Sequence, residues 1–323
     1  FNRAQYLKRT LDSVLKYFPK DSTGPDVYIS QDGANTGVTR EIEKFSEKFN
    51  LAVDQKKVTH LRHDQSGVVG NGYEKLAVHF GWALRKLFDV HGAARAIILE
   101  DDLEIAPDFF EYFRAMAPLL DADTSILAVS AWNDNGQARY IADSAAVLRS
   151  DFFPGLGWML NKRLWDELGP KWPRGYWDDW LREPRQRKNR VTLRPEVCRT
   201  YTFGKNGVSH AQFFGQYLGS IKLNDKAVSW NTMDLSYLSK DVYDEHLEHA
   251  VSSARLVDIH DIRSIRGPRG GGCTEDLKME YSSLSRGRPP SFSSLAQALG
   301  IMGESKARVP RTAYKGIVQI RCG

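Results

Sequence analysis

Strand-like and helix-like segments alternate along roughly the first two hundred residues, and this alternation constrains the fold more than any other feature of the sequence. Short apolar runs, typical of buried strands, come between stretches whose apolar residues recur at helical spacing. The apolar runs are residues 27–30, 96–99 and 126–131, and the helical stretches are 7–18, 73–88 and 108–120. The pattern predicts an α/β fold with a mostly parallel sheet and helices on both faces.

The character of the sequence changes beyond about residue 205, where periodicity weakens and Gly and Ser become more frequent. Residues 266–272 (RGPRGGG) are typical of a loop. A length of 323 residues is enough for about two domains. We therefore expect a larger domain over residues 1–204, a linker over 205–217 and a smaller C-terminal domain over 218–323.

The composition indicates a globular protein, with 41% hydrophobic and 26% charged residues. A net charge of +5 is too small to argue for nucleic acid, and we expect no such partner. The basic stretch 182–190 (REPRQRKNR) could contact phosphates, but it is more typical of a solvated loop. The three cysteines lie far apart without CxxC spacing, which indicates neither a zinc site nor a disulfide scaffold.

No apolar run approaches the roughly 18 residues that cross a bilayer, and the sequence has no secretory leader pattern. The first residue is Phe1 rather than Met, so we expect the sequence to begin inside a longer gene product. We therefore expect these residues to be soluble and any membrane anchor to lie in a preceding segment.

Three adjacent carboxylates, Glu100, Asp101 and Asp102, follow the apolar run at 96–99, and Asp32 follows another expected strand. Ligands of parallel sheets bind at these carboxyl ends. Adjacent carboxylates repel one another, and a hard divalent ion such as Mg²⁺ or Mn²⁺ takes such oxygen ligands together with substrate phosphates. The alternative is a solvated acidic turn, or a helix N-terminus whose dipole favours these negative charges.

A second acidic pair, Asp178 and Asp179, lies between Trp177 and Trp180. A carboxylate in such a partly dry place has a raised pKa, which suits a general base. The flanking aromatic rings also offer flat surfaces on which a sugar ring can pack. The alternative is a helix N-terminus that an Asp caps, with Trp in the core.

Single histidines are weaker evidence for a functional site than these acidic clusters. His79 and His210 are more typical of structural roles, and His60 and His63 lie three residues apart without a third partner, so we expect no zinc site there. The motifs GxxxxGK[ST], GxGxxG and GxSxG are absent, which argues against P-loop, Rossmann and α/β-hydrolase chemistry.

Several long blocks occur in order along nearly the whole chain, and together they resemble the N-acetylglucosaminyltransferase I family. The blocks are LEDDLEIAPDFFEYF (99–113), SAWNDNGQ (130–137), SDFFPGLGWML (150–160), PKWPRGYWDDWLR (170–182), RPEVCRTYTFGKNGVSHAQFF (194–214) and VPRTAYKGIV (309–318).

The resemblance implies a GT-A fold and an enzyme that uses UDP-N-acetylglucosamine with Mn²⁺ and inverts the anomeric carbon. The family transfers the sugar to O2 of the α1,3-linked mannose on a five-mannose N-glycan, which opens the route to hybrid and complex glycans. Its members are type II Golgi membrane proteins with a lumenal catalytic part. A membrane anchor is therefore implied for the full-length protein.

The resemblance also implies roles for individual residues. Asp102 matches the manganese ligand of the family's EDD motif, and Glu100 and Asp101 match residues that hold the donor's sugar parts. Asp178 matches the general base, and Trp177 matches a residue beside the donor sugar.

The resemblance implies that a second set of residues binds the nucleotide and the acceptor. Arg3 and Asp32 match positions that contact the nucleotide, and His79 matches a position near the uracil. Ser209 lies in the loop at 205–217, which the resemblance implies becomes ordered over the UDP-sugar and helps to form the acceptor site.

The sequence departs from the family pattern in a few places. Because it begins at Phe1, most of the family's first strand is expected to be missing, and residues 71–74 (NGYE) differ from the usual sequence. Gly and Ala stand at positions 33 and 128, where animal members carry paired cysteines. Two rival functions stay open: transfer to O-mannose, and a non-catalytic protein that binds sugar nucleotides or glycans.

Overall fold

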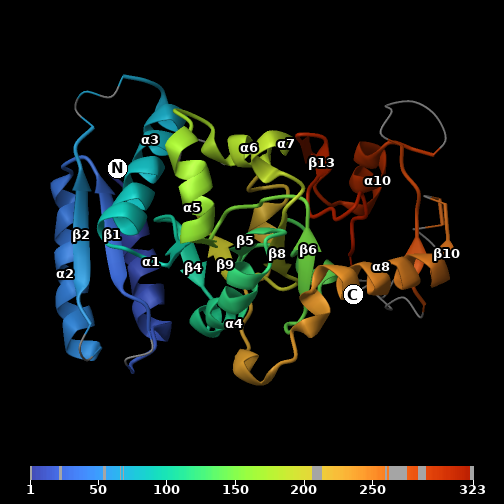
Figure 1. Ribbon diagram of the computed structural model, residues 1–323, viewed down its shortest axis with the longest axis horizontal. Coiled ribbons are helices and arrows are strands. Elements are labelled where there is room, and N and C mark those ends of the chain that lie inside the picture. Colours follow the sequence, from blue (N-terminus) through green and yellow to red (C-terminus); the bar gives the residue numbers. More distant parts are fainter. Residues whose placement is uncertain are drawn as a thin grey trace.

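Figure 1 shows the chain as a computed structural model, which describes residues 2–21, 24–53, 56–65, 67, 69–205, 213–258, 260–261, 275–282 and 289–320. The α-helices are α1 (Ala4–Tyr17), α2 (Thr36–Ala52), α3 (Gly72–Arg85), α4 (Phe109–Ala122), α5 (Lys162–Leu168), α6 (Trp177–Arg182), α7 (Pro184–Arg187), α8 (Lys240–Ser253) and α10 (Phe292–Leu299). The strands are β1 (Val27–Asp32), β2 (Val58–His63), β3 (Arg95–Ile98), β4 (Leu103–Ile105), β5 (Ile126–Ser130), β6 (Val147–Ser150), β7 (Trp158–Asn161), β8 (Val191–Pro195), β9 (Thr200–Thr202), β10 (Arg255–Leu256), β11 (Leu277–Lys278), β12 (Ser305–Lys306) and β13 (Val309–Pro310).

The central sheet has the strand order β3-β7-β5-β8-β6. Strands β5 and β8 are parallel, whereas β3–β7, β5–β7 and β6–β8 are antiparallel. The α/β class is confirmed, but the expectation of a mostly parallel arrangement is wrong for this sheet. The connection through α4 does make β3 and β5 run in the same direction, as alternation predicts. Strand β7 lies between them and runs in the opposite direction. The alternation of strands and helices in the sequence does not predict this insertion.

A smaller parallel pair, β1 and β2, lies beside α2 at the left of Figure 1. Its register places Asp32 opposite His63 at the end of the pair. Helix α2 covers this pair with buried apolar side chains at helical spacing, namely Val38, Ile42, Phe45 and Phe49. The sequence pattern predicted β1 but not α2 or β2.

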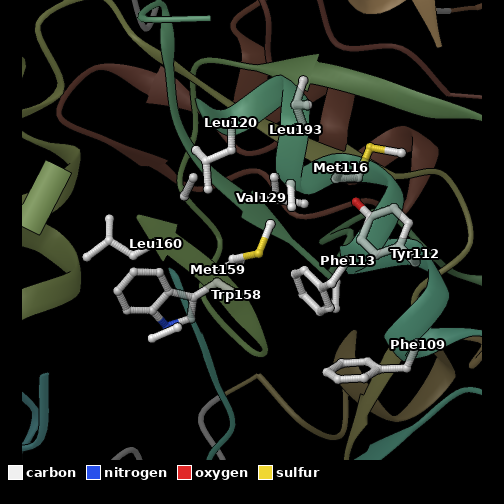
Figure 2. Close-up of a cluster of buried hydrophobic side chains, with 14 of the residues drawn as sticks. Phe109, Tyr112, Phe113, Met116, Leu120, Val129, Trp158, Met159, Leu160 and Leu193 are labelled. Atoms are coloured by element: carbon white, nitrogen blue, oxygen red, sulfur yellow. The ribbon is translucent and has the colours of Figure 1, made fainter. Parts of the chain in front are cut away.

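Helix α4 packs against the central sheet and forms the main core, as Figure 2 shows. Its buried side chains recur every three or four residues, so they share one face of the helix. Burying a large apolar side chain of this kind stabilises the fold by roughly 1.5–3 kcal/mol. The labelled members are Phe109, Tyr112, Phe113, Met116 and Leu120 from α4 and Val129, Trp158, Met159, Leu160 and Leu193 from the sheet.

A fully buried ion pair ties α4 to later parts of the chain. Asp108, directly before α4, accepts hydrogen bonds from Arg199 Nη2 at 2.9 Å, and both side chains are 0% exposed. The carboxylate also accepts from Trp230 Nε1 at 2.8 Å and from Asn224 Nδ2 at 3.0 Å. These four residues join the start of α4, the start of β9 and the segment that follows residue 218.

Several residues after 218 add to the same core, while Ala296 and Ile301 form a smaller cluster with Tyr140. Trp230, Leu238 and Tyr243 belong to the hydrophobic cluster that contains α4 and the central sheet. Figure 1 shows α8 and α10 on the right, beyond β6. The domain boundaries expected from the sequence remain a prediction. Within the described ranges, no helix combines the length and apolar character that a membrane span needs.

We expect Asp108→Asn to lower the free energy of unfolding by about 3–5 kcal/mol, because it leaves Arg199 buried without a counter-charge. The matched control is Asp12→Asn, which removes an exposed ion pair with Lys8 within α1. That change should cost less than about 1 kcal/mol. Urea unfolding of both variants provides the measurement. Equal stability of the two variants would show that the buried pair is not important for the fold.

Candidate active site

Helix α1 positions the acidic turn between β3 and β4. Thr10 Oγ1 accepts a hydrogen bond from Leu103 N at 3.2 Å, and Ser13 Oγ accepts one from Ile105 N at 2.9 Å. These bonds hold β4 along the helix. Arg3, directly before the helix, therefore lies close to the carboxylates that precede β4.

Arg3 bridges two of these carboxylates. Its Nη1 donates to Asp102 Oδ2 at 2.9 Å, and its Nε donates to Asp101 Oδ2 at 3.1 Å. Burial opposes the charge of Arg3, but Asp101 and Asp102 outweigh that effect and raise the pKa of the guanidinium. The structure thus brings together an arginine and an acidic motif that lie about a hundred residues apart in the sequence.

Negative charge accumulates at this turn. Burial, together with the charges of Asp102 and Asp101, raises the pKa of Glu100 to about 8. Burial is also the main reason why the pKa of Asp102 is raised, with Arg3 opposing it. Gly204 packs against this cluster so closely that a Cβ there would lie 2.2 Å from Asp102 Oδ2. Only glycine fits beside the carboxylate at that distance.

The second acidic pair lies at the start of α6. Arg182 Nη1 donates to Asp178 Oδ2 at 2.8 Å and to Asp179 Oδ1 at 2.7 Å, and Lys306 Nζ donates to Asp179 Oδ2 at 3.3 Å. Burial opposes the ionisation of Asp179, but Arg182 and Lys306 outweigh it and lower its pKa. The Asp178 side chain stays 41% exposed, and its charge contributes to the raised pKa of Glu100. The two acidic motifs therefore lie within electrostatic range of one another.

Trp177 belongs to an aromatic wall behind this pair. Its ring stacks on Phe80 of α3, on Trp158 of β7 and on Trp172, with centroids 4.5–6.0 Å apart. It is 6% exposed, as the alternative of Trp in the core predicts, but the Asp cap of that alternative is wrong, because Tyr176 is the N-cap residue and makes no side-chain capping bond. The indole thus packs α6 against α3 and β7, while the Asp178 side chain stays partly exposed.

Helix α3 begins with a capping box made by the residues that depart from the family pattern. Asn71 Oδ1 accepts from Glu74 N at 3.1 Å, and Glu74 Oε2 accepts from Asn71 N at 2.7 Å. This reciprocal pair satisfies backbone donors at the helix start. The unusual sequence at 71–74 therefore still starts a helix, which carries His79 and Phe80.

Asp32 and His79 lie together at the end of the small parallel sheet, with His79 Nδ1 4.0 Å from Asp32 Oδ1. Burial raises the pKa of Asp32. Burial, and then the neighbouring His63, lower the pKa of His79 to about 4. His63 Nδ1 lies 3.1 Å from His79 Nδ1, and the His63 ring stacks on Trp82 at 4.5 Å.

The structure brings most of the predicted site residues into two clusters: Asp32 with His79, and Arg3 with Glu100, Asp101 and Asp102, which lie within electrostatic range of Asp178. Ser209 lies outside the described residues. The expectation that His63 lacks metal-ligating partners is wrong, because strand pairing and α3 supply Asp32 and His79. The sequence analysis also missed the role of Arg182, although its i, i+4 spacing from Asp178 was a signal.

The basic stretch that could have contacted phosphates is largely paired with acidic side chains of the chain itself. Arg187 pairs with Asp151 at 2.9 Å, and Arg190 pairs with Glu167 at 2.8 Å. These contacts tie α7 and the turn that follows it to the body of the fold. The stretch therefore acts as a structural element here.

The whole chain, residues 1–323, matches the sequence profile of the GNT-I family. A curated relative, the alpha-1,3-mannosyl-glycoprotein 2-beta-N-acetylglucosaminyltransferase of Arabidopsis thaliana, is 44% identical over 327 residues, which cover 99% of this chain and 69% of the relative. A solved structure, the mannosyltransferase PcManGT of Pyrobaculum calidifontis in complex with GDP-Man and Mn²⁺, covers 79% of this chain and 73% of its own at a TM-score of 0.41 and 14% identity. The match over the full length shows that the chain belongs to the GNT-I family.

Proposed function

We propose that the chain is an inverting N-acetylglucosaminyltransferase of the GT-A type. It moves N-acetylglucosamine from UDP-N-acetylglucosamine to O2 of the α1,3-linked mannose of the five-mannose N-glycan, the step that initiates hybrid and complex N-glycans. The name of the Arabidopsis relative describes this kind of transfer, and the family match supports it along the whole chain.

One observation carries the proposal: the carboxylates of two distant motifs lie within electrostatic reach of one another. Glu100 and Asp178 are far apart in the sequence. Burial and then the adjacent Asp102 and Asp101 are the main causes of the raised pKa of Glu100, and the charge of Asp178 adds a smaller contribution in the same direction. An acidic cluster suited to a cation and an exposed carboxylate suited to a base are the two groups that this reaction needs.

The acidic cluster fits a hard divalent cation such as manganese. It offers only oxygen ligands, and two of its three carboxylates, those of Asp101 and Asp102, share one guanidinium, that of Arg3. Asp102 would hold the ion, and Glu100 and Asp101 would hold the sugar parts of the donor. A bound Mn²⁺ supplies a Lewis acid that neutralises the charge of the departing diphosphate. Arg3 adds a further positive charge beside this carboxylate cluster.

The protein's own groups complete the proposed site. Asp32 and His79 lie where the nucleotide base would bind, and the buried imidazole of His79 is neutral near pH 7 because its pKa is about 4. Asp178 Oδ2 is fixed by Arg182 at 2.8 Å. The remaining oxygen, Oδ1, can then accept the proton of the mannose hydroxyl as the new bond forms.

We also propose that the full-length protein is a type II Golgi membrane protein whose catalytic part is lumenal. The family resemblance supports this location. The high-mannose N-glycan acceptors would then be carried by glycoproteins in the same lumen.

The direct test offers UDP-N-acetylglucosamine and Mn²⁺ together with either the five-mannose N-glycan or an O-mannosyl peptide. We expect transfer to the N-glycan alone, with a β-linkage to O2 that NMR can assign. Transfer only to the O-mannosyl peptide would favour the rival acceptor. Tight binding of the UDP-sugar without transfer to either acceptor would favour a non-catalytic protein.

We expect Asp178→Asn to lower kcat by about 10²–10⁴-fold, which is the usual contribution of a general base. The affinity for UDP-N-acetylglucosamine should change little, because the substitution keeps the shape and lies on the acceptor side. Asp179→Asn is the matched control, since Asp179 is held by both Arg182 and Lys306.

The control should lose much less activity than Asp178→Asn. Initial rates and calorimetric binding of UDP provide the two readouts, and circular dichroism checks the fold. A folded Asp178→Asn enzyme that keeps more than about a tenth of the wild-type kcat would exclude the assignment.

A further inference from the structure

We propose that Asp32, His63 and His79 form a zinc site, separate from the carboxylates before β4, and that zinc bound there excludes the nucleotide base. Each residue offers one ligand atom, and the three atoms lie within 4.8 Å of one another. In the described ranges this is the one such group of three or more metal-ligating side chains. The residues come from three elements: the end of β1, the end of β2 and the middle of α3.

The distances are close to those that zinc requires. Tetrahedral zinc binds imidazole nitrogen and carboxylate oxygen at about 2.0–2.2 Å, so its ligand atoms lie about 3.3 Å apart. His63 Nδ1 and His79 Nδ1 are 3.1 Å apart, and His79 Nδ1 and Asp32 Oδ1 are 4.0 Å apart. The carboxylate must approach by roughly 0.7 Å, and zinc would replace the hydrogen that lies between the two nitrogens.

The Asp32 carboxylate has a second oxygen that is buried without a hydrogen-bond partner. Asp32 is 6% exposed, and its Oδ2 accepts no hydrogen bond from any described residue. An unsatisfied buried carboxylate oxygen carries a desolvation cost that a cation would relieve. The closeness of the three side chains is one observation that indicates a ligand between them, and this unsatisfied oxygen is a second.

The surroundings would orient the two imidazoles toward the ion. Ser30 Oγ lies 3.1 Å from His79 Nε2, the ring nitrogen that faces away from the site. Such a contact fixes the orientation of a metal-binding imidazole. Trp82 stacks on the ring of His63 at 4.5 Å, with an interplanar angle of 11°.

The two cation sites differ in chemistry. Two nitrogen ligands and one oxygen ligand suit zinc, whereas the all-oxygen set around Asp102 suits manganese. The exclusion of the base rests on the proposed function, which places uracil against Asp32 and His79. Zinc held by the same two residues would occupy that place, and it would therefore compete with the donor substrate.

Isothermal titration of metal-free protein with zinc chloride tests the site directly. We expect wild type and Asp102→Asn to bind one zinc ion with similar affinity. We expect His63→Gln to bind it at least about tenfold more weakly, because loss of an outer-shell partner alone costs about 10–100-fold. His63→Cys, which supplies another zinc ligand, should restore tight binding and so separates ligation from a folding defect.

Equal zinc affinity in wild type and His63→Gln, or loss of the ion in Asp102→Asn, would overturn the site. An excess of uridine, which carries the base without metal-binding phosphates, should weaken zinc binding to wild type. Zinc binding that uridine leaves unchanged would overturn the exclusion of the base. Transfer activity is measured separately, so failure of the proposed function and failure of the zinc site are distinguishable.

Discussion

The buried pair between Asp108 and Arg199 is the interaction on which the arrangement of this protein most depends. Asp108 follows β4 and Arg199 precedes β9, and these two strands pair with one another. The acidic motif precedes β4, while Gly204, which packs against Asp102, follows β9. A charge pair at one end of the two-stranded ladder therefore fixes the register at the other end. Trp230 and Asn224 add the later part of the chain to the same carboxylate.

Local patterns in the sequence were enough to predict the helices and strands with strong apolar periodicity. Helix α4 is one example, because its buried residues recur every three or four positions, and strand β5 is another, because all five of its residues are buried and form a continuous apolar run but for Ser130. Strand β2 was missed because its sequence, VTHLRH, contains no continuous apolar run, and all of its residues are only partly buried or exposed. The direction of β7 was also beyond such patterns. Tertiary packing, rather than local propensity, decides where a strand inserts.

The candidate site was predictable where chemistry lies in adjacent residues and unpredictable where folding creates it. The carboxylates within each of the stretches 100–102 and 178–179 are contiguous in the sequence, and the structure places the two stretches within electrostatic range of one another; their expected roles stay predictions. The partners of His63 are not contiguous, since the β1–β2 register and α3 bring them together. Likewise, the burial of Trp177 follows from contacts with Phe80, Trp158 and Trp172 rather than from the WDDW spacing.

The central claim is that the donor lies between the two clusters, with its base at Asp32 and His79 and its diphosphate at Asp102. A crystal structure with UDP and Mn²⁺, in which anomalous scattering locates the manganese, tests this most directly. The account predicts manganese against Asp102 and the diphosphate, and uracil against Asp32 and His79. Manganese bound away from Asp102, or uracil bound elsewhere in a fully occupied complex, would contradict it.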